Sequence, residues 1–184
     1  MSGVDLAVVI LAYNEEKHIG RALKSLAGLA REIFVIDSES TDRTVEIAAQ
    51  KGARVVTHDW QGFGPQKNFA LSLAQGEWVL SIDADERVSP ALAREIVRAI
   101  AEGRADGYEI PRLSRFAGRA MRHSGWFPDY VLRLFRRGKA RFSDDLVHER
   151  VILDGREGFL LAVANAEGTY YRYMKAWLAG RRHD

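Results

Sequence analysis

The first hundred residues alternate between short apolar runs and segments with helical periodicity. Four runs predict strands, and the first of them has the continuous β-branched pattern of a strand buried on both faces. The four are LAVVILA (6–12), EIFVID (32–37), ARVVTH (53–58) and EWVLSID (77–83). Strands that alternate with helices predict right-handed βαβ units and a mostly parallel sheet.

The intervening segments carry helix signals. Ile19, Leu23 and Leu26 fall on one helical face after the first strand. Later helices are bounded by residues that start or stop helices. These are the Ser/Thr/Asp group of 38–44 and Gly52 for the second helix, Pro65 and Gly76 for the third, and Ser89-Pro90 and Gly103 for the fourth.

The pattern changes after Gly103. GYEIPR (107–112) and YVLRLFRR (130–137) predict strands, and the Arg- and aromatic-rich stretch between them predicts a hairpin or loop. We interpret the first half as a nucleotide-type platform and the later half as a cover of mixed strands. No Pro-, Gly- or Ser-rich linker separates them, so we expect a single domain over 1–184. We divide it into the parts 1–103 and 104–152 and a short atypical segment 153–184.

Composition indicates a soluble globular protein. Of the 184 residues, 47% are hydrophobic and 28% are charged. There is no cysteine, which excludes disulfides and thiolate metal sites and suits a reducing cytoplasm. The N-terminal apolar run lacks a basic flank and is too short for a signal peptide or a spanning helix. We therefore expect a cytoplasmic protein.

The net charge of +2 is unevenly distributed. Residues 104–150 contain eleven Lys/Arg and six Asp/Glu. This excess favours an anionic ligand such as a phosphorylated molecule or a lipid headgroup, and an ordinary solvated surface is the alternative. No recognised nucleic-acid motif accompanies the charge, so we expect no nucleic-acid partner.

Carboxylates crowd the end of the fourth strand. Asp83 and Asp85 are two positions apart, so on an extended backbone they point to the same side. Two such carboxylates suit Mg²⁺ or Mn²⁺, which would relieve their repulsion. The alternative is an acidic loop that caps the next helix. We expect Glu86 to begin that turn without a metal role.

Two further polar groups follow predicted strands. Asp37 ends the second strand, where its carboxylate would accept hydrogen bonds from a nucleobase or a ribose. The alternative is a turn or helix cap, and Asp42 is a rival cap. Tyr13 and Asn14 follow the first strand. Because ligands bind at the carboxyl ends of parallel strands, we expect these residues and Asp83 to meet at one edge.

These motifs together resemble the family 2 glycosyltransferases of the GT-A fold. Within that family the chain is most similar to the bacterial lipopolysaccharide core enzymes that add glucose to an inner-core heptose. The resemblance covers roughly residues 5–152. The motifs that carry it are VVILAYNEEKHIGRALKSL, EIFVIDSESTDRT, GFGPQKNFALSLAQGEWVLSIDADE and GWFPDYVLRLFRR with FSDDLVHE.

The resemblance implies a Rossmann-like, mostly parallel α/β sheet flanked by helices. It also implies an inverting transfer from a nucleotide-diphosphate sugar, with Mg²⁺ or Mn²⁺ as cofactor. Residue by residue, the resemblance places Ala12, Tyr13 and Glu15 along the nucleotide pocket and Asp37 on the base, which is expected to be uracil. It places Lys67 and Asn68 near the base or diphosphate. It places Asp83 near the ribose and the metal, and Asp85 on the metal.

Inversion requires a base that takes the proton of the acceptor hydroxyl. We expect Glu149 to be that base and His148 to contact the metal or diphosphate; the alternative for His148 is a structural role. Asp129 is the second candidate, and Asp144 and Asp145 are further acids in this region.

Other residues of this half have two possible roles each. Arg133 and Arg136 alternate with apolar residues, so we expect them on one side of a strand, with one holding phosphate, or else as surface charge. Trp126 and Phe127 would form a wall that stacks on a sugar, or part of the core.

The resemblance fades after about residue 153. Residues 170–182 place aromatic and basic side chains at helical spacing, which suits a helix that packs on the domain or one at a membrane interface near a lipid-linked acceptor. The expected acceptor is a saccharide or a lipid-linked saccharide. The short C-terminal part also leaves an alternative function: a nucleotide-sugar-binding module without catalysis.

Overall fold

The structure is a computed structural model of the chain, and it describes residues 4–116, 119–120, 127–143, 151–153 and 160–162. The helices are α1 (Ile19–Ser25), α2 (Thr44–Gln50), α3 (Phe63–Leu73) and α4 (Pro90–Glu102). The first strands are β1 (Leu6–Ala12), β2 (Glu32–Asp37), β3 (Arg54–Thr57), β4 (Trp78–Asp83) and β5 (Gly107–Arg112). The later ones are β6 (Arg115–Phe116), β7 (Arg119–Ala120), β8 (Asp129–Arg136), β9 (Ala140–Phe142), β10 (Val151–Leu153) and β11 (Leu160–Ala162).

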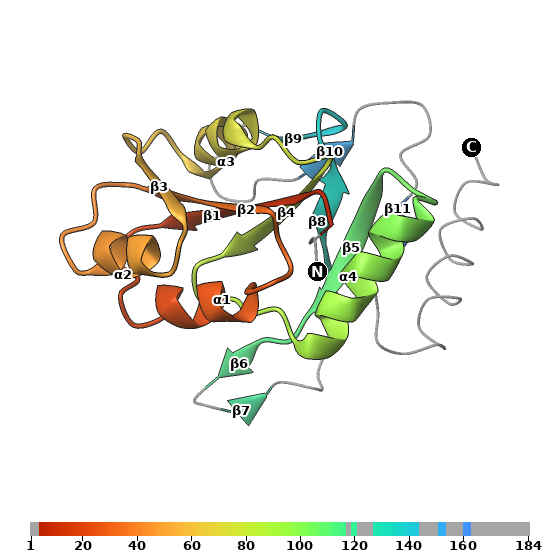
Figure 1. Cartoon of the computed structure of the whole chain (residues 1–184), viewed down its shortest axis with the longest axis horizontal. Coiled ribbons are helices and arrows are strands. Elements are labelled where there is room, and N and C mark those ends of the chain that lie inside the picture. Colours follow the sequence, from red (N-terminus) through yellow and green to blue (C-terminus); the bar gives the residue numbers. More distant parts are fainter. Residues whose placement is uncertain (1–3, 117–118, 121–126, 144–150, 154–159, 163–184) are drawn as a thin grey trace.

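Seven strands form one sheet in the order β11-β5-β8-β4-β1-β2-β3 (Figure 1). The four predicted strands, β1 to β4, are parallel to one another, and β8 runs antiparallel between β4 and β5. The prediction of an α/β fold with a mostly parallel sheet is confirmed. The later half was predicted to form a cover, and here the structure differs, because β5, β8 and β11 extend the same sheet.

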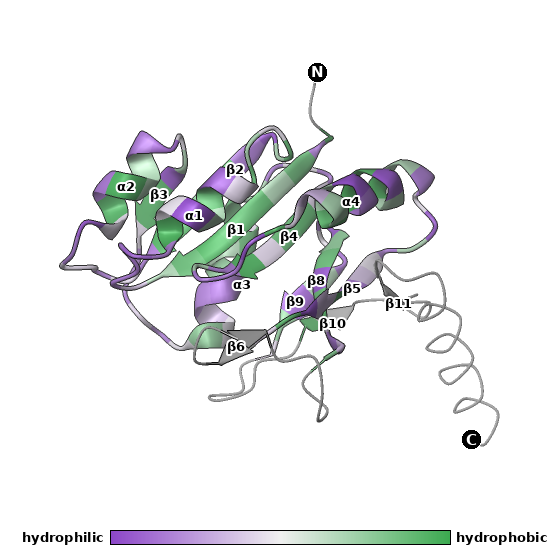
Figure 2. Cartoon of the chain, turned by 90° about the horizontal axis from the view of Figure 1, so that it is seen from below, coloured by the Kyte–Doolittle hydropathy of each residue, from purple (hydrophilic) through white to green (hydrophobic). Residues whose placement is uncertain are grey.

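Strand β1 lies in the middle of the sheet and is buried on both faces. Leu6, Val8 and Ile10 pack in the core that α1 and α4 cover, and Ala7 and Val9 pack in a second core under α3. Figure 2 shows β1 as a continuous hydrophobic ribbon behind α1 and α4. The unbroken apolar run in the sequence therefore corresponds to a strand between two helical layers.

Helix boundaries follow the predicted signals with one exception. The Ser89 side chain accepts a hydrogen bond from the Leu92 N–H at the start of α4, and Gly103 ends that helix in the left-handed conformation. Helix α3 ends at Leu73, before the predicted stop at Gly76. At Gly76 a Cβ would lie 2.7 Å from the backbone nitrogen of Ala7, so this glycine permits a close approach of the chain to β1.

Candidate active site

The carboxyl ends of β1, β2 and β4 meet at one edge of the sheet. In the strand register Ala12 lies opposite Asp37, and Leu11 lies opposite Asp83. The predicted convergence of these strand ends is confirmed. Strands β2 and β3 lie on one side of β1, and β4 lies on the other, so the winding of the chain reverses here. Ligands of such sheets bind in the crevice outside the strand ends at this reversal.

Asp37 ends β2 with its side chain almost fully buried, at 1% exposure. Its Oδ2 accepts a hydrogen bond from the Ser40 N–H at 2.9 Å, which closes the turn after the strand. Its Oδ1 is buried and accepts no hydrogen bond from any described residue. A buried acceptor without a donor costs about 1–3 kcal/mol, so a donor that reached Oδ1 would bind favourably.

The rival cap, Asp42, has a separate and local role. Its Oδ1 accepts a hydrogen bond from the Thr44 N–H at 2.9 Å, at the start of α2, and its Oδ2 accepts one from the Glu16 N–H at 3.0 Å. Desolvation acts to raise the pKa of Asp42. These hydrogen bonds and the one from the Thr44 hydroxyl nevertheless hold that pKa below its usual range. Asp42 therefore organises the helix start, and Asp37 remains available for a ligand.

The loops after β1 and β2 are joined by hydrogen bonds. The Asn14 N–H donates to Ser40 Oγ at 2.9 Å, and Asn14 Oδ1 accepts from the Thr41 N–H at 2.8 Å. One residue on, the Glu15 N–H donates to Thr44 Oγ1 at 2.7 Å. The two loops thus form one connected rim above the strand ends.

The rim also holds the other predicted nucleotide-pocket residues. Ala12 is buried at the end of β1, and its carbonyl accepts from the Ser38 N–H at 3.0 Å. Tyr13 follows with its side chain 60% exposed. Glu15 places its carboxylate 2.8 Å from His18 Nδ1. Asn14 has a φ of 55° and Glu39 a φ of 61°, a conformation that is rare for residues other than glycine and that recurs at binding sites.

Asp83 lies between two buried cations. Its Oδ2 is 2.8 Å from Nη2 of Arg133, and its Oδ1 is 3.5 Å from Nζ of Lys67. The side chains of Lys67 and Arg133 are only 6% and 9% exposed, whereas that of Asp83 is 40% exposed. The same Nη2 of Arg133 also donates to Glu86 Oε1 at 2.9 Å. Positive charge from α3 and β8 therefore surrounds this carboxylate.

These contacts separate the two acids electrostatically. Burial acts to raise the pKa of Asp83, but Arg133 and then Lys67 hold it below its usual range. Burial raises the pKa of Glu86, and the charge of Asp83 adds to the rise against the opposing effect of Arg133. Asp83 is thus the acid of this pair that stays ionised most readily.

A β-bulge positions Arg133. In the pairing of β8 with β5, Leu134 lies opposite Tyr108 and Leu132 opposite Glu109, so Arg133 is the extra residue at this shift of register. A bulge adds one residue to a strand and redirects a side chain. Leu132 and Leu134 consequently pack in different cores.

The expectation that Arg133 and Arg136 share one side was wrong. The two residues are three positions apart, and an odd spacing on a strand places side chains on opposite sides. Arg136 pairs with Glu77 and Asp106 and lies over the Trp78 ring, near the start of β4.

Asp83 and Asp85 were predicted to point to the same side because an extended backbone was assumed. The backbone from Asp83 to Asp85 is not extended. Strand β4 ends at Asp83, and a turn follows in which the Glu86 N–H donates to the Asp83 carbonyl at 3.0 Å. The Glu86 carboxylate accepts the Asp83 N–H at 2.9 Å. The sequence prediction missed the contact of Glu86 with Arg133, because the two residues lie 47 positions apart.

Oxygen donors for a hard cation are present at the turn. Within the described part of the chain no group of three or more His, Asp or Glu side chains lies close enough to hold a metal alone. Asp85 is exposed, and among the described residues its carboxylate makes no hydrogen bond or ion pair. Mg²⁺ is commonly held by one or two carboxylates together with substrate phosphates, and Asp85 with the nearby Asp83 fits that pattern.

Lys67 and Asn68 are neighbours on α3 with different surroundings. Lys67 Nζ lies 5.3 Å from the centre of the Phe142 ring in addition to its contact with Asp83. The Asn68 amide donates to the Phe142 carbonyl at 2.9 Å and accepts from the Phe142 N–H at 2.8 Å. Asn68 therefore attaches β9 to α3, while its contact with a nucleotide stays a prediction.

On the acceptor side, the described candidate is Asp129 at the start of β8. Its Oδ2 accepts hydrogen bonds from Nε and Nη2 of Arg112 at 3.0 and 2.7 Å. Arg112 Nη1 also lies 4.0 Å from Glu86 Oε1, which links Asp129 to the Asp83 turn. Phe127 is exposed. The other candidates, Trp126, Asp144, Asp145, His148 and Glu149, and the segment 170–182 lie outside the described residues.

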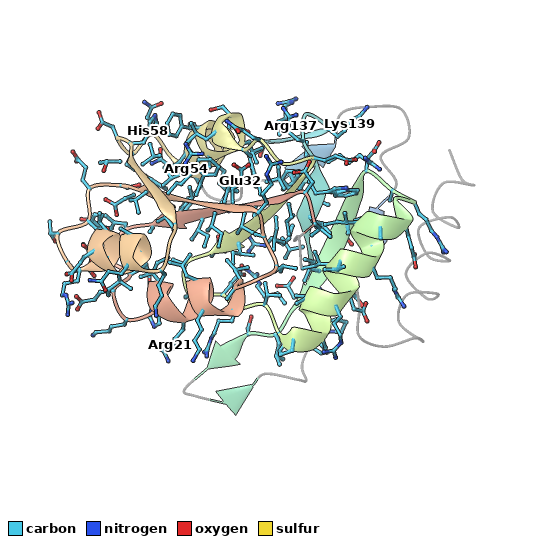
Figure 3. All side chains as sticks on the ribbon, viewed as in Figure 1. Arg21, Glu32, Arg54, His58, Arg137 and Lys139 are labelled. Atoms are coloured by element: carbon cyan, nitrogen blue, oxygen red, sulfur yellow. The ribbon has the colours of Figure 1, made fainter. Side chains whose placement is uncertain are left out.

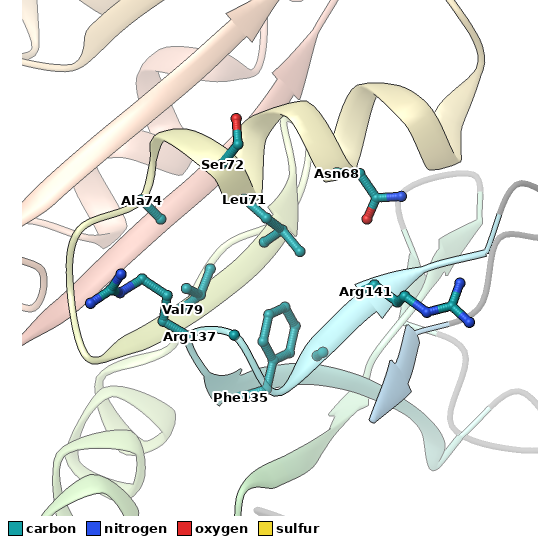
Figure 4. A pocket seen from close by; sticks show the side chains of 10 residues that line it. Asn68, Leu71, Ser72, Ala74, Val79, Phe135, Arg137 and Arg141 are labelled. Atoms are coloured by element: carbon teal, nitrogen blue, oxygen red, sulfur yellow. The ribbon is translucent and has the colours of Figure 1, made fainter. Parts of the chain in front are cut away.

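A cavity of about 360 Å³ lies between α3 and the segment that runs from the end of β8 into β9 (Figure 4). Leu71, Val79 and Phe135 form apolar parts of its wall, and Arg137 and Arg141 also line it. Val79 is near the start of β4, and Asp37 and Asp83 do not line the cavity. The cavity is therefore separate from the carboxyl-edge site. Within the described ranges, none of the helices has the length and apolar character that crossing a bilayer requires.

Comparison with known proteins identifies the family. A family model described as glycosyl transferase family 2 matches residues 7–151. An uncharacterised glycosyltransferase of Rickettsia typhi is 33% identical over 174 residues, which are 91% of this chain and 60% of that protein. The lipopolysaccharide core biosynthesis glycosyltransferase LpsC of Rhizobium meliloti is 34% identical over 166 residues, which are 83% of this chain and 59% of that protein. The chain thus spans about 60% of the length of these relatives.

Solved structures agree with the predicted GT-A fold. Staphylococcus aureus TarS in complex with UDP superposes with a TM-score of 0.55 at 25% identity, over 72% of this chain and 46% of that one. Glucosyl-3-phosphoglycerate synthase from Mycobacterium tuberculosis was crystallised with Mn²⁺, UDP and glucosyl-3-phosphoglycerate. It superposes with a TM-score of 0.50 at 29% identity, over 59% of this chain and 44% of that one. The fold, the family-model match and the two relatives lead to one conclusion: this chain belongs to glycosyl transferase family 2.

Proposed function

We propose that this protein is an inverting, metal-dependent glycosyltransferase. It moves a hexose, expected to be glucose, from a UDP-sugar to a saccharide or lipid-linked acceptor, with an inner-core heptose of lipopolysaccharide as the expected acceptor. The observation that carries the proposal is the position of Asp37 and Asp83 on either side of the end of β1, at the reversal of the sheet. One carboxylate there has a buried oxygen to which no described residue donates, and the other lies between two cations.

The relatives support the donor class. TarS was crystallised with UDP, and the Mycobacterium synthase with Mn²⁺, UDP and glucosyl-3-phosphoglycerate. LpsC is named for lipopolysaccharide core biosynthesis, and a Haloferax volcanii relative, 38% identical over 109 residues, is named a dolichyl-phosphate hexose transferase. These names support a nucleotide-sugar donor and a lipid-linked saccharide as acceptor.

Each donor-side residue has a role in the proposal. Asp37 Oδ1 accepts the imide N–H of uracil, and Ala12, Tyr13 and Glu15 line the pocket along the rim. Asp83 accepts from the ribose. Lys67 and Arg133 are cations beside Asp83. They hold the diphosphate by replacing part of their contact with the Asp83 carboxylate by contacts with phosphate oxygens. Asn68 keeps its predicted place near the base or diphosphate.

Asp85, with Asp83 and His148, would hold Mg²⁺ or Mn²⁺ at the turn after β4. When bound, such an ion stabilises the charge that develops on the leaving diphosphate. On the acceptor side, Glu149 takes the proton of the attacking hydroxyl, and Asp129 is the alternative base. Arg112 holds Asp129 through one carboxylate oxygen, which leaves Oδ1 for a proton.

The proposal places the protein in the cytoplasm, with peripheral contact at the inner face of the membrane where a lipid-linked acceptor is presented. The excess of Lys and Arg over residues 104–150 supports attraction to an anionic surface. Phospholipid vesicles with and without anionic lipid test this contact by co-sedimentation. Equal sedimentation with neutral and anionic vesicles would exclude an electrostatic association.

Thermal shift with a panel of nucleotides and nucleotide sugars, each with and without Mn²⁺, tests the donor class. Because a ligand that binds the folded state raises the melting temperature, UDP and UDP-glucose should give the largest shifts. UDP release from radiolabelled UDP-glucose then tests turnover. Absence of any nucleotide-dependent shift would end the proposal. Binding without turnover, unaffected by Glu149→Gln and by Asp129→Asn, would favour the alternative of a non-catalytic nucleotide-sugar-binding module.

A further inference from the structure

Gln66, on the first turns of α3, is a fully buried polar residue with no role in the proposed chemistry. Its side chain is 0% exposed and makes three hydrogen bonds. Nε2 donates to Ser38 Oγ at 3.1 Å and to the His58 carbonyl at 3.0 Å, and Oε1 lies 2.8 Å from His58 Nδ1. The amide therefore connects the chain after β2 to the chain after β3. Figure 3 shows His58 beyond β3, on the side of the sheet that α3 covers.

The partners fix a single arrangement of these groups. A carbonyl oxygen only accepts, so the atom of Gln66 that faces the His58 carbonyl is the amide nitrogen. Oε1 then faces His58 Nδ1, which must carry a proton to donate to it. The His58 ring also stacks on Phe69, with ring centres 3.8 Å apart. Neither the amide nor the imidazole can reverse without losing hydrogen bonds.

This network holds the backbone around Asp37. Ser38 is the next residue in the chain, and its N–H donates to the Ala12 carbonyl at 3.0 Å. The His58 N–H donates to the Asp37 carbonyl, also at 3.0 Å. Gln66 thus contacts Ser38, which follows Asp37 in the chain, and His58, whose N–H binds the Asp37 carbonyl.

We propose that Gln66 is a positioning residue for nucleobase recognition, acting through Ser38 and His58 to hold the Asp37 carboxylate where it meets the base. The inference rests on the proposed function, because it assumes that Asp37 binds uracil. A hydrogen bond to a buried carboxylate depends on distance and direction, so a loosened backbone weakens base binding. The diphosphate meets other residues, Lys67 and Arg133, and is not affected in the same way.

Calorimetry on Gln66→Met tests the inference, because methionine has a similar length and lacks the amide. UDP and inorganic pyrophosphate are titrated separately in the presence of Mn²⁺. We expect the Kd for UDP to rise about ten-fold, a loss typical of one displaced hydrogen bond, with the Kd for pyrophosphate unchanged. Gln50→Met, an identical change on the exposed surface of α2, is the matched control and should leave both constants unchanged.

Asp37→Asn provides the second arm. If Gln66 acts through Asp37, Gln66→Met should add little to the loss of UDP affinity already caused by Asp37→Asn, since coupled residues are not additive. Three results would overturn the inference. The losses of UDP affinity in the two variants could be fully additive, or Gln66→Met could leave the Kd for UDP unchanged. Gln66→Met could also weaken the binding of UDP and of pyrophosphate equally. If Gln66→Met fails to fold, Ser38→Ala removes one of the three contacts and should weaken UDP alone. Wild-type protein that binds no nucleotide would instead refute the proposed function.

Discussion

Nη2 of Arg133 lies 2.8 Å from Oδ2 of Asp83, although the two residues are 50 positions apart. The arginine comes from the antiparallel strand β8 and the aspartate from the end of the parallel strand β4. The contact allows Asp83 and Glu86 to occupy one turn, because the guanidinium neutralises part of their repulsion. Positive charge is thus built into the place where a diphosphate would arrive.

Removing this cation should destabilise the fold. Arg133→Met leaves two partly buried carboxylates facing each other and removes two charge-assisted hydrogen bonds, so we expect the free energy of unfolding to fall by about 1–3 kcal/mol. Urea unfolding at neutral pH measures it. Arg98→Met, at an exposed pair with Glu102 on α4, should stay within about 0.5 kcal/mol of the wild type. Equal stability of the two variants would contradict the neutralising role of Arg133.

Asp85→Ala should separate activity from stability. An exposed carboxylate contributes little to folding, so the melting temperature should change by no more than about 1–2 °C. UDP release from UDP-glucose with Mn²⁺ should be abolished. The comparison variant is Glu102→Ala, at the far end of α4, which should keep both properties. A large drop in melting temperature for Asp85→Ala would indicate a structural role for Asp85.

Asn68→Ala should act mainly on stability. The substitution leaves the N–H and carbonyl of Phe142 without their partners, which costs about 1–3 kcal/mol. Chemical denaturation tests the loss, with Ser72→Ala on the exposed side of the same helix as control. A preserved unfolding free energy together with a large loss of UDP affinity would instead support the predicted contact of Asn68 with the nucleotide.

Tyr108 should make stability fall at high pH. Burial raises the pKa of its phenol, which donates to the Ala99 carbonyl at 3.0 Å. The unfolded chain releases this proton near pH 10 and the folded chain only above that, so its contribution is complete below about pH 10 and declines as pH rises further. Tyr108→Phe should cost about 1 kcal/mol at pH 7 and give a flatter decline above about pH 10 in denaturation experiments. Parallel alkaline profiles for the two proteins would show that Tyr108 does not contribute.

The sequence was sufficient for features that depend on local pattern. The apolar run of β1 predicted a strand buried on both faces, and the strand–helix alternation predicted that Asp37 and Asp83 would reach the same edge. Contacts between distant segments were not predictable in this way. Glu86 and Gln66 were missed because their partners lie 47 and 28 positions away. The helical spacing of Gln66 was a signal that could have been used. Gln66 precedes Ala70 by four residues and Ala74 by eight, so it lies on the buried side of α3.

The bulge at Arg133 makes strand β8 sensitive to its length. Side chains before Arg133 and side chains after it follow opposite alternation, so Leu132 and Leu134 serve different cores although they are two positions apart. Deleting one residue within β8 would exchange the faces of the apolar positions on one side of the deletion, and a compensating insertion would have to fall in the same strand. During evolution of the family, we therefore expect insertions and deletions to accumulate in the loops around β8 and to be tolerated poorly within it.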